Sequence, residues 1–131
     1  MKYLFTILLV AISVTSFAQG NLQFNQVLNF DYSAIVPAYG DVSVGTLTVP
    51  PDKVWKITAA SSSGDVLTSR DKTMIVVNNH TISAARSNGI SNNTPYWLSS
   101  GTSNQIKFAN LYSSGRDIVG SISVLEFNVV P

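Results

Sequence analysis

Apolar and polar residues alternate along most of this chain in short segments, and no sustained helical period appears after Gln19. The segments are rich in β-branched and aromatic residues and are separated by clusters of Gly, Pro, Asn, Asp and Ser. This pattern predicts roughly eight to ten short strands and leaves no place for a substantial helix. The expected fold class is all-β: an antiparallel β-sandwich of the jelly-roll type, with a closed barrel as the alternative.

Two similar strand–turn–strand units stand out, at residues 45–61 around Trp55 and at residues 95–108 around Trp97. Their tryptophans are expected in the core or in strand packing. A hairpin is predicted over residues 73–82, because two Asn residues between apolar strands suit a type I′ turn. Residues 31–40 and 84–94 are expected to be loops or, for the first, an edge segment, since Pro37 excludes a central strand.

Two runs have apolar residues at both odd and even positions: Met74–Val77, and Ile122–Val129 within the last predicted strand, Ile118–Val130. The alternation slips by one between Val124 and Leu125, which predicts either a β-bulge or burial of both faces. Because one face of a sandwich sheet should meet water, we expect a partner chain to cover the second. The predicted oligomer interface consists of Ile75, Val77, Ile122 and Val124.

Glu126 interrupts the apolar run of the last strand. Two interpretations are open for it. It faces solvent opposite Leu125 and Phe127, or it is a paired group at a subunit interface.

The N-terminus has a separate pattern, with Lys2 followed by an almost wholly apolar run and then Ser16-Phe17-Ala18. This three-part pattern is typical of a secretory signal peptide, and the apolar run is too short for a spanning helix. We expect residues 1–18 to be the signal peptide and residues 19–131 to form a single β-sandwich domain. The mature protein is then secreted, at the cell surface or in the periplasm, and the absence of Cys favours a bacterial source.

Charge excludes several classes of partner. Without Lys2, the Lys and Arg residues number seven and match the seven Asp and Glu residues. A neutral domain lacks the basic surface needed for nucleic acid or anionic membrane, so neither is expected as a partner. A surface rich in Ser, Thr and Asn suits self-association or hydrogen bonding to neutral glycans.

Catalytic chemistry has little support, and we expect no enzyme, no catalytic residues, no metal site and no cofactor. There is no Cys, and the single His, His80, lies beside the predicted hairpin turn, where it is expected to be exposed. All six Asp residues fall in predicted turns or loops, where Asp commonly organises the backbone. Convergence of two carboxylates, or calcium binding by loop Asp residues, stays open. Aromatic side chains in or near loops are the candidate glycan-binding residues: Tyr39, Tyr96 and Tyr112.

Four segments resemble a type of small secreted bacterial β-sandwich protein: V-P-P-D-K-V-W-K-I, M-I-V-V-N-N-H-T-I, P-Y-W-L-S-S-G-T and S-I-S-V-L-E-F-N-V. The departures lie in turns, where Pro51-Asp52 replaces an expected Ala-Gly and Asn79 an expected Gly. The resemblance implies fold and export and carries no activity. In architecture the chain is also similar to trimeric jelly-roll domains of fibres and of the C1q/tumour-necrosis-factor kind.

The function expected from the sequence is an exported, non-catalytic structural or assembly module that self-associates, as a trimer or within a surface fibre. The alternative is a carbohydrate-binding or adhesin domain that uses the loop tyrosines.

Overall fold

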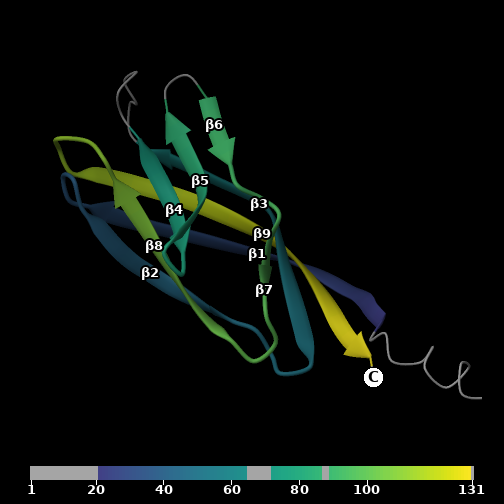
Figure 1. The fold of residues 1–131 in the computed structure, drawn as a ribbon. Coiled ribbons are helices and arrows are strands. Elements are labelled where there is room, and N and C mark those ends of the chain that lie inside the picture. Colours follow the sequence, from purple (N-terminus) through teal and green to yellow (C-terminus); the bar gives the residue numbers. More distant parts are fainter. Residues whose placement is uncertain (1–20, 65–71, 87–88, 131) are drawn as a thin grey trace, which may run out of the picture.

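The computed structural model describes residues 21–64, 72–86 and 89–130. The predicted signal peptide lies outside the described residues. Nine strands form in the described part of the chain: β1 (Asn21–Val36), β2 (Asp41–Thr48), β3 (Lys53–Gly64), β4 (Thr73–Val77), β5 (His80–Arg86), β6 (Gly89–Asn92), β7 (Tyr96–Leu98), β8 (Ser103–Asn110) and β9 (Arg116–Val130). Figure 1 shows them as two layers, with the long β1 and β9 side by side.

The strands pair in the nested order of a jelly roll. One sheet has the order β1-β9-β3-β7 and the other the order β2-β8-β4-β5-β6. The chain folds back on itself, so that β1 pairs with β9, β2 with β8, β3 with β7 and β4 with β5, all antiparallel. The short β6 extends the second sheet beyond β5. The predicted all-β sandwich of jelly-roll type is therefore confirmed.

The core lies between the two sheets. The largest fully buried side chains are aliphatic except for one ring, that of Phe108. Trp55 is also buried, with its ring tilted against Phe30 at a centroid distance of 5.6 Å. The two tryptophans were predicted in the core or in strand packing, and Trp55 takes the first of these places. Trp97 takes the second: it is 47% exposed and packs across strands against Phe127 of β9.

The two similar strand–turn–strand units do not form hairpins of their own. In each unit the first strand and the second lie in different sheets, so the turn crosses the sandwich. The two crossings stack on each other: Val49 N donates to Thr102 O at 2.9 Å, and Gly101 N donates to Pro50 O at 3.2 Å. The two units therefore lie side by side, with β2 paired to β8 and β3 paired to β7.

The Asn78-Asn79 turn joins β4 and β5 as predicted. Both residues have positive φ, 48° and 64°, which is the geometry a type I′ turn needs. The side chain of Asn78 also donates to Asn104 Oδ1 at 2.6 Å and accepts from the backbone N–H of Gln105. His80 follows the turn and is exposed as expected.

Two segments expected as loops belong in part to strands. Residues 31–36 continue β1 to Val36, because their backbone groups pair along β9 up to Arg116. β1 is an edge strand, as Pro37 indicated, and it ends there. Within 84–94, β5 continues to Arg86 and Gly89–Asn92 forms β6. The polar composition of this segment did not indicate the short edge strand. Of the Asp residues predicted in turns or loops, three lie in strands instead: Asp31, Asp41 and Asp117.

The phase slip in β9 is not a bulge of β9. Its even-numbered residues from Ile118 to Glu126 all face the core, and the register with β1 and β3 is shifted in those partner strands instead. The extra residues are Asn25 in β1 and Thr58 in β3. Leu125 and Phe127 therefore point to the outer face of the sheet, where they are half-buried.

Candidate functional site

The outer face of the β1-β9-β3-β7 sheet divides into two halves of different chemistry. Cross-strand partners share a face, so each register pair places its side chains together. Toward the start of β9 the face carries short polar side chains, in rows such as Asp31–Ser121–Ser61. Toward its end the face is apolar, in rows such as Phe24–Phe127–Val54. The boundary lies near the row of Asn29 and Ser123.

We call the apolar half the aromatic patch. Five of its side chains are between 41% and 59% exposed, and three are half-buried among them. Its members are Leu22, Phe24, Val27, Val54, Trp97, Leu125, Phe127 and Val129. Single exposed apolar residues are ordinary on protein surfaces, but a contiguous group drawn from four strands indicates a binding surface.

Three rings form a row across the patch. Phe24 meets Phe127 edge to face with centroids 6.3 Å apart, and Trp97 lies tilted on the other side of Phe127 at 5.8 Å. The Lys56 ammonium lies 5.2 Å from the centre of the Trp97 ring, a cation–π contact. The row thus runs from the edge strand β1 through β9 to the edge strand β7.

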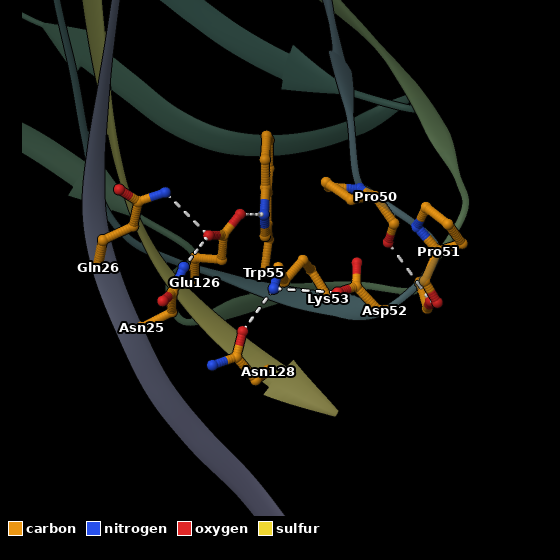
Figure 2. Close-up of polar contacts among 10 residues, drawn as sticks. Asn25, Gln26, Pro50, Pro51, Asp52, Lys53, Trp55, Glu126 and Asn128 are labelled. Atoms are coloured by element: carbon orange, nitrogen blue, oxygen red, sulfur yellow. Dashed lines mark hydrogen bonds and ion pairs between the residues drawn. The ribbon is translucent and has the colours of Figure 1, made fainter. Parts of the chain in front are cut away.

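Directly behind the patch, on the inner face, lies the buried carboxylate of Glu126, which is 4% exposed. Figure 2 shows its two oxygens turned toward donors from two strands. Oε2 accepts from Trp55 Nε1 at 2.8 Å, and Oε1 accepts from Asn25 Nδ2 at 2.6 Å and from Gln26 Nε2 at 2.9 Å. Lys53, whose Nζ donates to Asn128 Oδ1 and lies 3.1 Å from Asp52, supplies a nearby positive charge.

These donors keep Glu126 ionised. Burial by itself raises the pKa of the carboxyl group, but the three donated hydrogen bonds and the charge of Lys53 outweigh it. The pKa of Glu126 therefore lies below its ordinary value. The prediction of a solvent-facing Glu126 is wrong. The group is paired, but its partners come from its own chain.

The Glu126 carboxylate also stabilises the β-bulge in β1, and this bulge determines which β1 side chains belong to the aromatic patch. Asn25 is the extra residue of β1, and it and Gln26 both donate to the same Oε1. With the extra residue in place, Phe24 and Val27 both point outward although their numbers differ in parity. Without it, Phe24 would share the inward parity of Leu28 and Phe30. The carboxylate therefore positions one end of the aromatic row.

The lowered pKa of Glu126 predicts an acid-dependent stability. Its contribution is fully present above the unfolded-state pKa, about 4.3, and is lost as the pH falls through the lower folded-state pKa. We therefore expect the difference in unfolding free energy between the native protein and Glu126→Gln to narrow as the pH falls from about 5 to about 3. Urea unfolding at several pH values measures it. The pKa of Asp52 is lowered too, but its carboxylate is exposed and screened by solvent, so Asp52→Asn is the control and its difference should stay small at every pH. A Glu126→Gln difference independent of pH would contradict the assignment.

The four residues predicted as an oligomer interface are placed by the structure in the core. Ile75, Val77, Ile122 and Val124 have no exposed surface within the single chain. They face the opposite sheet and have no surface left for a partner. The outward positions of the same strands are Met74 and Val76 on β4 and Leu125 and Phe127 on β9, all half-buried.

The three candidate tyrosines do not form one site. Tyr39 and Tyr112 are neighbours, since Tyr39 N donates to Tyr112 O at 3.0 Å, and the Arg116 guanidinium lies 4.1 Å from the centre of the Tyr112 ring. Tyr96 lies apart from them on β7, where its ring stacks on His80 with centroids 4.9 Å apart. Only Tyr39 is largely exposed, at 71%.

Acidic groups do not converge either. Asp41 pairs with Lys107 at 3.5 Å and Asp52 with Lys53, each at the surface. Asp65 and Asp71 lie outside the described residues. Among residues 21–64, 72–86 and 89–130, no group of three His, Cys, Asp or Glu side chains is placed to hold a metal ion, and no helix long and apolar enough to cross a membrane is found.

Sequence reasoning missed the aromatic patch and the pairing of Glu126. One signal for Glu126 was available: counting by twos from Ile118 through Ile122 and Val124 arrives at Glu126 and not at Leu125. A carboxylate on a core parity needs donors, and the buried indole of Trp55 needs an acceptor. Phe24 had no such signal, because the extra residue Asn25 can be located only once the register with β9 is known.

Comparison of the chain with protein-family models, with curated proteins and with solved structures gave no match. The fold and the site geometry are therefore the basis for assigning a function.

Proposed function

We propose that this protein is an exported, non-catalytic structural module that associates with further copies of itself through the aromatic patch. The observation that carries the proposal is the row of Phe24, Phe127 and Trp97 exposed on the outer face of a sheet whose other half is polar. Burial of such rings stabilises an association through the apolar area removed from water.

The layout of the row favours a second copy as the partner. A two-fold axis parallel to the strands would place β1 of one copy over β7 of the other, so that Phe24 meets Trp97 of the second copy. A two-fold interface requires a surface that complements itself, and a row with a ring at each end meets this requirement. The neutral balance of charge in residues 19–131 leaves no net repulsion between copies.

Four titratable groups in the described part of the chain are engaged by neighbours, which favours a non-catalytic role. Both oxygens of Glu126 are engaged by donors of the same chain, and Asp41 and Asp52 each lie beside a lysine. His80 is stacked on Tyr96, with ring centroids 4.9 Å apart. A general acid or base needs a group free to exchange a proton with a substrate, and these groups are committed to neighbours.

Removal of the two outer rings tests the proposal. The double variant Phe24→Ser/Trp97→Ser is expected to raise the dissociation constant of the oligomer by about 30-fold or more, because truncating a central interface aromatic costs about 2 kcal/mol. Light scattering coupled to size-exclusion chromatography, over a range of concentrations, measures the mass.

Ile35→Ser is the matched control. Ile35 lies on the same strand as Phe24 and is 78% exposed, but it is outside the patch, so the oligomer should be retained. A native protein that stays monomeric at about 1 mM would refute self-association, since that corresponds to less than about 4 kcal/mol. An oligomer that survives loss of both rings would exclude the patch as its interface.

A further inference from the structure

The polar half of the same outer face contains a groove that self-association does not use. Its volume is about 480 Å³, and its walls come from β1, β3, β6 and β9. It opens where β3 runs beyond β7, which pairs with β3 only from Trp55 to Ile57. The volume falls in the range of about 300–1,000 Å³ that is usual for small-molecule sites.

Hydroxyl groups and one carboxylate line this groove. Ser61 and Ser121 face each other across β3 and β9, with their hydroxyl oxygens 2.9 Å apart, and Ser63 lies further along β3. Asp31 completes the row from β1. Within the described part of the chain the Asp31 carboxylate has no hydrogen-bond or ion-pair partner, so its oxygens are free to accept from a ligand.

Apolar side chains form part of the groove wall. Val119 on β9 and Ile90 on β6 are 52% and 56% exposed, and both line the groove. Of the described lining residues, none is a lysine or arginine. The described lining therefore combines acceptors and small donors with exposed C–H surface, and these lining residues offer no cation to an anionic ligand.

We propose that this groove binds a neutral oligosaccharide. Adjacent ring hydroxyls of a sugar would donate to the two oxygens of Asp31, which are strong charge-assisted acceptors. The serine hydroxyls can donate or accept, which suits the mixed hydroxyl pattern of a sugar edge. The C–H face of the ring would lie on Val119 and Ile90. The site is separate from the aromatic patch and does not depend on self-association.

The test is a titration of the ¹⁵N-labelled purified protein followed by NMR. The probes are four neutral hexasaccharides, namely β-1,4-glucan, β-1,4-xylan, β-1,4-mannan and α-1,4-glucan, each taken to about 10 mM. At least one is expected to shift the amides of Ser61, Val119 and Ser121, with a dissociation constant of about 0.1–1 mM, ordinary for a shallow site. Asp31→Asn should weaken that binding about tenfold, because the charge-assisted bonds are lost.

The controls separate the groove from the rest of the face. Asp117→Asn removes an exposed carboxylate of β9, on the same outer face but outside the groove, and should leave binding unchanged. Phe24→Ser/Trp97→Ser should also retain binding, so failure of the patch and failure of the groove are distinguishable. No shift with any of the four probes, or shifts confined to the patch, would overturn the proposal. So would binding of a cationic glucosamine hexamer alone, since that would identify Asp31 as part of a cation site.

Discussion

Replacement of Glu126 by leucine is expected to lower the free energy of unfolding by about 2–4 kcal/mol. A hydrogen bond to a charged group contributes about 1.5–3 kcal/mol, and a buried donor left unpaired costs about 1–3 kcal/mol. The indole N–H of Trp55 is the donor most affected, because its bond to Glu126 is buried, whereas Asn25 and Gln26 are exposed and can turn to water. Urea unfolding at neutral pH measures the loss.

Glutamine at position 126 should recover part of the free energy of unfolding that leucine loses. Its side-chain oxygen can still accept from Trp55, and the amides of Asn25 and Gln26 can rotate to offer their oxygens to its N–H₂ group. We expect Glu126→Gln to cost about half as much as Glu126→Leu, the remainder reflecting the lost charge. Asp117→Asn, at an exposed carboxylate, should change stability by no more than about 0.5 kcal/mol. A leucine variant as stable as the native protein would show that the bond network contributes no net stability, as happens for some buried charges.

The same substitution links stability to the proposed surface. Since Asn25 and Gln26 fix the bulge of β1 through Glu126, loss of the carboxylate frees the segment that carries Leu22 and Phe24. One buried group thus supports both the end of an edge strand and the orientation of an exposed ring.

Local sequence signals predicted the fold well because they concern local backbone geometry. The paired Asn78-Asn79 could adopt positive φ, and the turn formed there. Pro37 ended a strand at an edge. Period-two alternation identified the core parity of β2 and β3, and burial of Leu47 and Ile57 follows it. These features depend on steric and hydrogen-bond rules that act within a few residues.

Features that depend on strand register were not predictable in the same way. The exposure of Phe24 depends on an extra residue that exists only relative to β9. The same holds for Ala59, which follows the bulge at Thr58 and is exposed, although it shares sequence parity with the buried Trp55 and Ile57. A shift of one residue turns every following side chain to the other face. The oligomer interface predicted at Ile75 and Ile122 had a different cause of error. In a run that is apolar at both odd and even positions, the sequence does not show which positions face the core, and the structure places Ile75 and Ile122 there.

The polar groove also could not be predicted from the sequence. Asp31 was expected in a loop, and Ser61, Val119 and Ser121 belong to segments far apart along the chain. Only the pairing of β9 with both β1 and β3 brings them into one surface. The sequence indicated that neutral glycans were compatible with the surface chemistry, and it pointed to tyrosines, which the structure divides between two places.

Substitution of Gly120 by alanine is expected to destabilise the sandwich by about 1–3 kcal/mol, the range for adding volume to a packed core. A Cβ at this position would lie 2.8 Å from Phe108 Cζ and 3.1 Å from Ile75 Cδ1. Both neighbours are fully buried and belong to the opposite sheet, so neither can move without disturbing other contacts. Gly115→Ala is the control. Its Cβ would meet only the Val36 carbonyl at 3.6 Å, so it should be neutral or slightly stabilising.

A second substitution shows whether the destabilisation by Gly120→Ala comes from the contact of the new Cβ with the Phe108 ring. Phe108→Leu removes the ring atoms that a Cβ at position 120 would strike, although by itself it leaves a cavity in the core. When the two changes are combined, the added methyl of Gly120→Ala occupies space that Phe108→Leu leaves empty. The double variant should therefore be more stable, by about 1 kcal/mol or more, than the sum of the two single losses predicts. Thermal and urea unfolding of the four proteins give this coupling. Additive losses would mean that Gly120 is required for backbone reasons and not because the Phe108 ring occupies the space beside it.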